Sequence, residues 1–453
     1  MDATVSETTQ TPALTGFTRE AVLALSAAKG EPDWVRDARL AAWATYERLP
    51  APKMTDEEWR RTSLRGLKLD RLAPFAGVGQ TIGSLADLVE ADDAGALALG
   101  GQQAGVVVQR DASTLWTEFD PAVAAKGVIF TDLDTAFREH PDLIRRHFMT
   151  TAVPTDFGKY EALHAANWQG GTFLYVPAGV TVELPFRSFA LAQAPSSAVF
   201  AHTLVVLEDG AEAFFVDGHR SPTQDAQSLA SGVVELILGE DAKLRYVQVQ
   251  DWGRHVWNMM TERSVLAEGA ELKSLQVTLG SKWSKNSIGA HLRGRNTLAE
   301  MLGIFFADGD QFFDHHTWQL HEAPNATSDL EFKGALKDGA RSVYSGLIKV
   351  SEGAQKTDAY QQNRNLVLSR TARADTIPNL EIAANDVRCT HGATVSQVEE
   401  EHVFYLQARG IPRSEAQKLI VEGFFRPVID RIPVEEIRDY LQGAIARKVG
   451  MGL

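Results

Sequence analysis

The fold class follows from one stretch, Val233-Val-Glu-Leu-Ile-Leu-Gly-Glu-Asp-Ala-Lys-Leu-Arg-Tyr-Val-Gln-Val249, in a chain of 453 residues. Two runs rich in Val, Leu and Ile, partly alternating with polar residues, flank a turn made of Gly239, Glu240 and Asp241. Such alternation is typical of strands with one buried and one solvent-facing side. The stretch therefore predicts a strand, a tight turn and a second strand.

The same turn formula recurs along the chain, as an apolar residue, acidic residues or Gly, and then alanine. It ends at Ala211, Ala242, Ala270, Ala340 and Ala354. The last four alanines are 28, 70 and 14 residues apart, all multiples of 14. A β-solenoid needs its turns in phase, because each turn of the coil stacks on the previous one. Hairpins of a β-sandwich would not need this phase, so the spacing favours a β-helix, with a sandwich as the alternative.

Helical patterns flank this β region. Apolar residues at three- and four-residue steps predict a first helix between Pro32 and Pro50. Near the C-terminus, Ser396 has the capping-box spacing to Glu399, and Pro427 is expected to interrupt a helix. A last helix, opened by Pro433, carries one apolar stripe. The stripe consists of Ile437, Leu441, Ala444 and Ile445.

The length of the chain favours more than one structural unit, since a single core rarely exceeds about 250–300 residues. We expect a flexible leader over residues 1–16 and a mainly helical region over 17–105. The β-helix core is expected over 106–385. Residues 386–453 are expected to form a C-terminal segment and a helical region.

The composition is that of a globular protein, with 44% hydrophobic and 23% charged residues. A net charge of −14, without a long Lys/Arg run, excludes nucleic-acid binding as the main activity. No stretch approaches the roughly 20 apolar residues of a membrane helix, and residues 1–15 lack the basic start and apolar core of a secretory signal. The one cysteine, Cys389, cannot form an intrachain disulfide, so the expected compartment is the cytoplasm.

The sharpest short pattern is Cys389-Thr390-His391. On an extended segment, residues two apart point to the same side, so the thiolate of Cys389 and the imidazole of His391 would project together. Both are suitable ligands for iron, zinc or a sulfur-bridged cluster. A small buried cysteine beside a hydrogen-bonded histidine is the structural alternative. Two ligands cannot close a tetrahedral site, so a metal here would need donors from another segment or a partner chain.

A second cluster lies earlier in the chain and consists of Asp314, His315, His316, Trp318 and His321. On a strand, Asp314 and His316 share one face, whereas His315 and His321 share the other. An Asp-x-His pair suits a metal ligand with its supporting carboxylate, and a solvated polar face is the alternative. The amide-rich run Tyr360-Gln-Gln-Asn-Arg364 could equally satisfy buried turns or bind a ligand.

The common enzyme motifs are absent from the sequence: there is no Walker lysine motif, G-x-S-x-G, H-E-x-x-H or C-x-x-C. Cys389 and His391, as nucleophile and base, would need a third orienting group that the sequence does not name. We therefore expect a protein that performs no covalent catalysis on its own.

The run from Gln355 to Pro412 is long and specific. It contains Gln355-Lys-Thr-Asp-Ala-Tyr-Gln-Gln-Asn-Arg-Asn-Leu-Val-Leu-Ser369, Pro378-Asn-Leu-Glu-Ile382, Asp386-Val-Arg-Cys-Thr-His-Gly-Ala-Thr394 and Phe404-Tyr-Leu-Gln-Ala-Arg-Gly-Ile411. With the earlier Trp168-Gln-Gly-Gly-Thr-Phe-Leu-Tyr-Val-Pro-Ala-Gly-Val180, this run resembles the SufB/SufD scaffold family of the SUF iron-sulfur cluster assembly system.

This resemblance implies a right-handed parallel β-helix flanked by helical regions. It points to the SufD type, because SufB-like chains carry several cysteines and a Glu directly after the motif histidine, where this chain has Gly392. A SufD-type chain is a non-catalytic scaffold that helps assemble clusters and acquire iron. It pairs with SufB through the β-helix and binds the ABC-type ATPase SufC through its C-terminal helices. A homodimer is also expected when the chain is isolated.

The resemblance also implies roles for individual residues. His391 would contribute to the interface where a nascent cluster forms, with Cys389 beside it. The cluster is then transient and shared with a partner subunit, and no tightly bound cofactor is expected in the isolated chain. The run expected in the ATPase-binding region comprises Phe424, Phe425, Arg426, Pro427 and Val428. ATP-driven closure of two SufC subunits would open the SufB–SufD interface to iron and sulfide.

Three alternatives stay open at this point. A SufB-type scaffold would carry the principal sulfur-accepting cysteine. A metal-dependent β-helix or cupin-like enzyme would use His315 and His316. A purely structural partner would bind no ligand at all.

Overall fold

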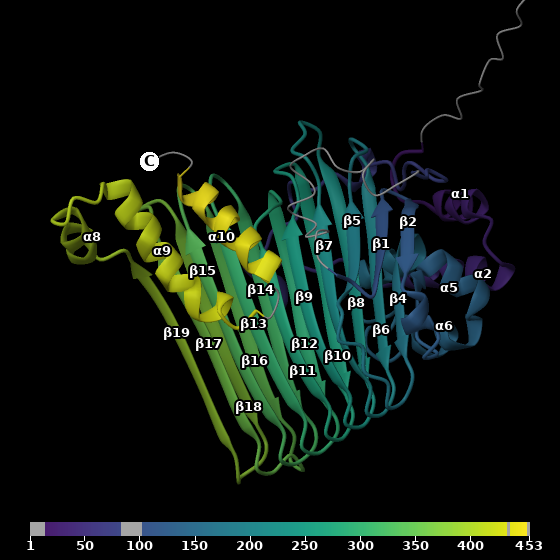
Figure 1. Cartoon of the computed structure of the whole chain (residues 1–453). Helices are drawn as coiled ribbons and strands as arrows, with labels where there is room; N and C mark the ends of the chain where they lie inside the picture. Colours follow the sequence, from purple (N-terminus) through teal and green to yellow (C-terminus); the bar gives the residue numbers. More distant parts are fainter. Residues whose placement is uncertain (1–13, 83–101, 433–434, 451–453) are drawn as a thin grey trace, which may run out of the picture.

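The structure, a computed structural model, describes residues 14–82, 102–432 and 435–450. Most of the predicted leader, and Pro433 at the predicted start of the last helix, lie outside the described residues. Strands occur from Gly105 to Gln397, and helices lie before, among and after them (Figure 1). The predicted boundaries at residues 105 and 385 stay predictions.

Successive strands alternate between two sheets, so the chain winds as a β-solenoid (Figure 1). In spatial order, the ten-stranded sheet comprises β19 (Arg388–Gln397), β17 (Asp358–Val367), β15 (Thr327–Leu336), β13 (Leu298–Ala307), β11 (Glu271–Thr278), β9 (Lys243–Asp251), β7 (Glu212–Arg220), β5 (Phe186–Leu191), β1 (Gly105–Arg110) and β2 (Ser113–Phe119). The nine-stranded sheet comprises β18 (Arg373–Ile382), β16 (Arg341–Val350), β14 (Phe312–His321), β12 (Trp283–Leu292), β10 (Val256–Leu266), β8 (Ser228–Leu238), β6 (Ala198–Leu207), β4 (Gly170–Val176) and β3 (Ile129–Asp132).

The strands pair in parallel along most of both sheets, which confirms the expected parallel β-helix and excludes the sandwich. Antiparallel pairing occurs at one end, between β1 and β2 and between β3 and β4. At the other end, β19 and β18 are the last strands of the two sheets. The solenoid therefore begins with antiparallel pairs and finishes with two parallel edge strands.

The 14-residue spacing predicted from the turns corresponds to half a turn of the solenoid. Lys243 pairs with Glu271, Glu271 with Leu298 and Leu298 with Thr327, so these turns take 28, 27 and 29 residues. The turn at Ala340 leads from β15 to β16, the opposite crossing from the turn at residue 354, which leads from β16 to β17. Each full coil of the solenoid therefore contains two tight turns, one at each crossing between the sheets. The number of residues per coil varies and does not follow a strict period.

The turn formula has a physical reason in the backbone. Gly210, Asp241 and Gly269 each adopt a left-handed conformation with φ between 55° and 68°. Gly tolerates this conformation without cost, and Asp is among the residues that adopt it more readily. The alanine that follows is wholly buried in every repeat. A small side chain is needed there because the turn directs it into the solenoid interior.

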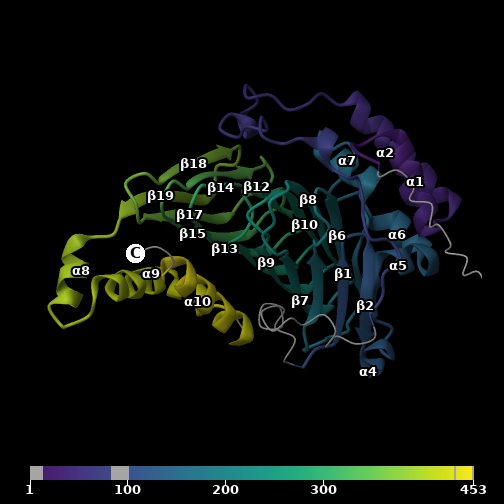
Figure 2. The ribbon, with the colours of Figure 1, turned by 90° about the horizontal axis from the view of Figure 1, so that it is seen from above.

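The solenoid carries helices on the outer faces of both sheets. Before and among the first strands lie α1 (Arg19–Lys29), α2 (Asp33–Arg48), α4 (Pro121–Ala124), α5 (Leu133–Glu139), α6 (Pro141–His147) and α7 (Lys159–Asn167), with short 3₁₀ turns at Glu57–Trp59 and Leu69–Arg71. After the strands come α8 (Glu400–Gln407), α9 (Arg413–Ile429) and α10 (Glu435–Gly450). Seen from above, α8, α9 and α10 lie on one side of the coil, and α1, α2 and α7 lie on the other (Figure 2).

Each helical group is held by an apolar layer. The predicted stripe of α10 is buried with α9 residues against the outer face of the ten-stranded sheet, where Phe214 and Ile304 contribute. Trp43 of α2 and Leu163 of α7 pack against Phe200 and other residues on the outer face of the nine-stranded sheet. In the described ranges, no helix is long and apolar enough to cross a membrane.

Two local predictions at the C-terminal end are wrong. Ser396 lies within β19, paired with Leu366, and Glu399 itself occupies the cap position of α8 without a side-chain cap bond. Helix α9 passes through Pro427 and ends at Ile429. Burial of α9 against the solenoid outweighs the local cost of the proline, as tertiary packing commonly does.

Candidate functional site

Cys389 and His391 lie on β19, the last strand of the ten-stranded sheet. In the parallel register, Cys389 stacks on Ala359 and His391 stacks on Gln361. Ala359 and Gln361 are both 1% exposed and face the solenoid interior. Because side chains in one column of a parallel ladder point the same way, Cys389 and His391 also face inward. They project together at the uncovered end of the coil.

The two side chains differ in environment. Cys389 is half-buried and packs against an apolar cluster that includes Ile348 and Ala359. Burial, with the nearby carboxylate of Asp358, raises the pKa of the Cys389 thiol. The side chain of His391 is exposed. Cys389 is thus held by the apolar end of the core, and the imidazole of His391 is accessible to a ligand.

The pair supplies two donor groups, with Cα atoms about 6.6 Å apart on an extended strand. Thiolate and imidazole together suit iron or an iron-sulfur species. Across the described ranges, no group of three or more His, Cys, Asp or Glu side chains is arranged to hold a metal ion. A site at Cys389 and His391 would therefore be completed by groups from outside these residues.

The structure separates the second predicted cluster between two faces of β14. His315 and His321 point inward, where burial lowers the pKa of each imidazole to about 4. Nε2 of His315 lies 3.1 Å from the hydroxyl of Thr278, and Nε2 of His321 lies 2.8 Å from that of Ser328. These neutral imidazoles are held within the core. They cannot share one metal ion with His316, which faces outward.

On the outer face, Asp314 forms a buried charge cluster. Its carboxylate accepts hydrogen bonds from Thr62 and from Lys285, and lies 3.0 Å from Nε2 of His316. Burial alone would raise the pKa of Asp314, but Lys285 and His316 hold that pKa below its usual range. The cluster ties the segment after α2 to the nine-stranded sheet.

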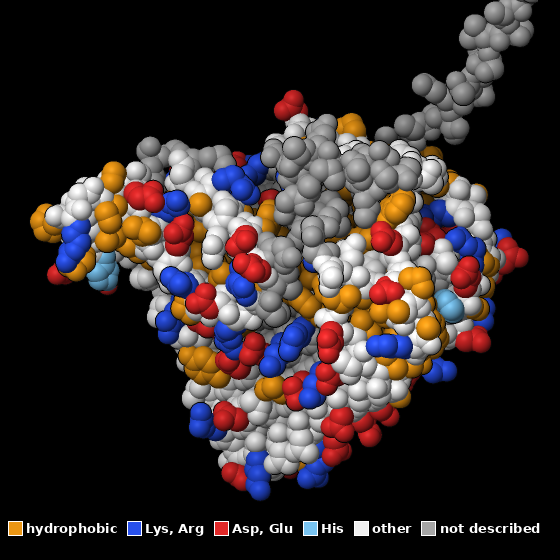
Figure 3. Space-filling model, viewed as in Figure 1, with side chains coloured by type: hydrophobic (Ala, Val, Ile, Leu, Met, Phe, Trp, Pro, Cys, Tyr) orange, Lys and Arg blue, Asp and Glu red, His pale blue; other side chains and the backbone are white. Residues whose placement is uncertain are grey.

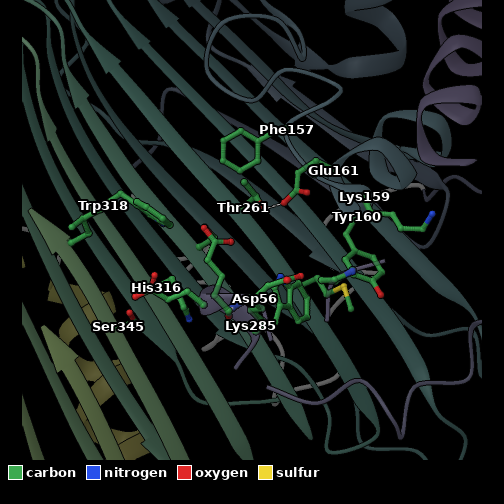
Figure 4. A pocket seen from close by; sticks show the side chains of 18 of the residues that line it. Asp56, Phe157, Lys159, Tyr160, Glu161, Thr261, Lys285, His316, Trp318 and Ser345 are labelled. Carbon is green, nitrogen blue, oxygen red and sulfur yellow. Dashed lines mark hydrogen bonds between the residues drawn. The ribbon is translucent and has the colours of Figure 1, made fainter. Parts of the chain in front are cut away.

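A groove of about 720 Å³ runs beside this cluster (Figure 4). Its floor crosses β10, β12 and β14 through Thr261, Lys285 and His316. Phe157 and Glu161, from the segment entering α7, line the groove as well. The cations in its wall already have partners: the ammonium of Lys285 donates to the carbonyl of Glu58 as well as to Asp314.

Sequence reasoning missed a buried carboxyl group under the N-terminal helices. Glu235 accepts hydrogen bonds from the backbone N–H groups of Met149 (2.6 Å) and Val153 (3.1 Å). Burial raises the pKa of Glu235 to about 8 and lowers that of the adjacent His202 to about 3. The available signal was that Glu235 is an acidic residue inside the apolar run quoted at the outset.

A second missed residue is Glu262 of β10, which points into the solenoid. Its carboxyl group accepts a hydrogen bond from Gln276, and burial raises its pKa to about 8. Gln361, from the amide-rich run singled out in the sequence, is also buried, beneath His391. The sequence signal for Gln361 was the amide-rich run from Tyr360, whose alternate residues point into the core.

Comparison with known proteins agrees with this architecture. A family model described as SUF system FeS cluster assembly, SufBD core domain, matches residues 189–424, and a model of the SufBD protein N-terminal region matches residues 113–187. An iron-sulfur cluster assembly SufBD family protein of Staphylococcus saprophyticus is 30% identical over 427 residues, covering 93% of this chain and 90% of the relative. The iron-sulfur cluster assembly protein SufB of Bacillus subtilis matches with the same identity and coverage. The chain therefore belongs to the SufBD family of SUF-system iron-sulfur cluster assembly proteins.

Proposed function

We propose that this chain is the SufD-type scaffold subunit of a cytoplasmic SUF complex, in which it pairs with SufB and binds the ATPase SufC. The observation that carries the proposal is the position of Cys389 and His391, which face the uncovered end of the solenoid as an incomplete ligand set. A half-site at an open end is suited to a cluster built between two subunits. The nascent cluster is cargo that passes on, and the chain performs no chemistry alone.

The SufD assignment is supported by the single cysteine and by Gly392. A Cβ atom at Gly392 would meet Gln362 at an ordinary 3.7 Å, and the residue has no left-handed backbone. The fold would therefore accept a glutamate at this position. The absence of a carboxylate here is a chemical feature of the chain and not a steric requirement.

Pairing with SufB is proposed at the end strands β18 and β19. Edge strands present unpaired backbone N–H and C=O groups that template association. Ile382 and Val395, on these two strands, are 42% and 48% exposed. Apolar exposure next to open strand edges supports an interface at this end, which a second copy of the chain could occupy in the absence of SufB.

Binding of SufC is proposed at the C-terminal helices. Of the run from Phe424 to Val428, Phe425 and Val428 are buried against the solenoid, whereas Arg426 and Pro427 are exposed. Helix α8 projects from the body and carries apolar side chains (Figures 1 and 3). Its Phe404 and Tyr405 are 71% and 55% exposed. We place the ATPase contact on α8 together with the exposed side of α9.

This arrangement links ATP to the cluster site. Helix α8 follows directly after β19, which carries Cys389 and His391. Movement of SufC-bound α8 would be transmitted to the last strand and to the interface with SufB. ATP can drive such opening only by favouring one arrangement of the complex, because a ligand shifts an equilibrium by its differential affinity for the two states.

Co-expression with SufB and SufC, followed by iron and sulfide analysis of the purified complex, tests the proposal. The complex is expected to hold iron and sulfide that the isolated chain does not. His391→Ala should lower cluster content at least tenfold while the three chains still co-purify. Unchanged cluster assembly in this variant, or no association with SufB, would refute the role.

A SufB-type scaffold is the second candidate, favoured by the 30% identity to the Bacillus subtilis protein named SufB. The two types differ in the sulfur chemistry of Cys389. Strong loading of sulfane sulfur on Cys389 after exposure to a cysteine desulfurase would support the SufB type. Weak loading, with loading of the co-expressed SufB, would support the SufD type.

A further inference from the structure

The carboxamide of Gln361 is an unsatisfied polar group inside the solenoid. The side chain is 1% exposed. Neither Nε2 nor Oε1 has a hydrogen-bond partner among the described residues. Buried side-chain amides are normally paired, and an unpaired one calls for a partner that is not yet in place. Gln361 lies on β17, one strand below the last strand of its sheet.

A glycine on the facing sheet makes room for this amide. A Cβ atom at Gly346 of β16 would lie 2.3 Å from Nε2 of Gln361. The amide therefore spans the interior from β17 to β16. Directly above Gly346 lies Pro378 of β18, which has no backbone N–H and no polar side-chain atom. From below, Leu330 stacks on Gln361 and offers no polar atom either.

Directly below Gly346 lies Thr317, whose hydroxyl is already paired with that of Tyr344 at 2.8 Å. Directly above Gln361 lies His391. Adjacent strands lie about 4.8 Å apart, within the combined reach of a glutamine and a histidine side chain. The imidazole of His391 is exposed at the open end and is free to turn toward the interior. Among the described residues, it is the one ring in this column of side chains that can form a hydrogen bond with the amide of Gln361.

We propose that Gln361 is a positioning residue for His391: its Oε1 accepts the N–H of the imidazole and leaves the other ring nitrogen free to bind the iron of the nascent cluster. This inference rests on the proposed function. Histidines that bind metals generally donate their second N–H to a carboxylate or carbonyl oxygen, which fixes the tautomer and raises the basicity of the ligand. Closure of the open end by a partner subunit would exclude water and strengthen this bond.

The test uses the complex with SufB and SufC and two substitutions of similar length. Gln361→Met removes the acceptor, and Gln361→Glu replaces it with a stronger one. Because the acceptor makes the ring a better electron donor, Met should raise the reduction potential of the bound cluster and Glu should lower it. Met should also speed the loss of iron to a chelator by about 10–100-fold, as loss of such a supporting residue does, whereas Glu should retain it.

Asn365→Leu is the matched control, because it removes another buried amide from the same strand and face. Asn365 bonds to Asn363 and stacks below Val395, away from His391. This variant should keep the potential of the unmodified complex. Equal potentials in the Met, Glu and unmodified complexes, or shifts of the same sign in both variants, would overturn the proposal.

The same experiment separates this inference from the proposed function. A complex in which His391→Ala loses the cluster but Gln361→Met retains it at an unchanged potential would refute the role of Gln361 alone. A complex in which His391→Ala changes nothing would refute both.

Discussion

The ammonium nitrogen of Lys285 on β12 lies 2.9 Å from a carboxylate oxygen of Asp314 on β14, with the two side chains 8% and 0% exposed. Two opposite charges are thus removed from water on the outer face of a sheet. Asp314 also accepts a hydrogen bond from Thr62, so one carboxylate joins two strands to the segment that follows α2. The pair holds the N-terminal part of the chain against the solenoid.

Asp314→Ala is expected to destabilise the protein by about 3–5 kcal/mol, because it leaves the charge of Lys285 buried without its counter-ion. Chemical denaturation monitored by tryptophan fluorescence would measure the loss. The surface pair Lys349–Glu381, with side chains 56% and 59% exposed, provides the control. Glu381→Ala should cost less than about 1 kcal/mol, and an equal cost for the two variants would contradict the role of burial.

The Cys389 thiol should react slowly with alkylating reagents. Burial and the charge of Asp358 raise its pKa, so less thiolate is present near pH 8 than for an ordinary cysteine. Asp358→Asn should increase the alkylation rate severalfold, as followed by mass spectrometry of the isolated chain. Glu381→Gln is the matched control, and an equal acceleration by both variants would show that Asp358 does not act on the thiol.

The exposed aromatic side chains of α8 are expected to supply binding energy for the ATPase without contributing to the stability of the fold. Phe404→Ser and Tyr405→Ser should each weaken SufC binding at least tenfold in calorimetry and leave the melting temperature unchanged. Phe425→Ala should instead destabilise the chain by about 3–5 kcal/mol, because Phe425 is fully buried. Retained SufC affinity in the double serine variant would place the contact elsewhere.

Stability should fall as the pH rises from about 6.5 to 8. The pKa values of Glu235 and Glu262 are raised to about 8 in the folded chain, so folding binds protons that the unfolded carboxyl groups release near pH 4.5. The contribution of these two carboxyl groups to the free energy of unfolding is complete below pH 4.5 and is lost as the pH rises to 8. Between these two pKa values, each carboxyl group lowers the free energy of unfolding by about 1 kcal/mol per pH unit.

The buried histidines have the opposite effect on stability: they lower the free energy of unfolding as the pH falls. His202, His315 and His321 have lowered pKa values, of about 3 for the first and about 4 for the others. The contribution of the neutral histidines to the free energy of unfolding is complete above pH 6.5 and is lost as the pH falls through their pKa values in the folded chain. The pKa values of His164 and His291 are lowered as well. Melting temperatures should therefore be highest between about pH 6 and 7, and Glu262→Gln should flatten the alkaline decline. A decline of unchanged slope in that variant would exclude Glu262 as its source.

The fold could be predicted from the sequence because the information is local and repeated. The turns at Ala211, Ala242 and Ala270 each carry a left-handed residue directly before an alanine that enters the core. The orientation of Cys389 and His391 was also predictable, since two residues of one strand share a face by geometry alone. The length of one full coil was not, because the turns at the two crossings share similar chemistry.

The partners of the buried charges could not be predicted. Thr62 and Asp314 are 252 residues apart in sequence, and nothing in either segment names the other. The burial of Glu235 could not be predicted either, because alternation cannot reveal that helices cover the outer side of a sheet. The course of α9 through Pro427 likewise depends on the apolar layer beneath that helix. Local rules fail at these places because the deciding contacts are distant in sequence.

The two ends of the solenoid are not equivalent, and this difference bears on the proposed association of chains. The coil begins with antiparallel pairs and finishes with the parallel edge strands β18 and β19. A head-to-tail contact between the ends would repeat without limit and produce a filament. If association uses the β18–β19 end alone, as proposed above, each chain has a single contact surface, and contact through it joins two chains end to end. A contact confined to one end of the coil thus gives a closed pair of chains and not a filament.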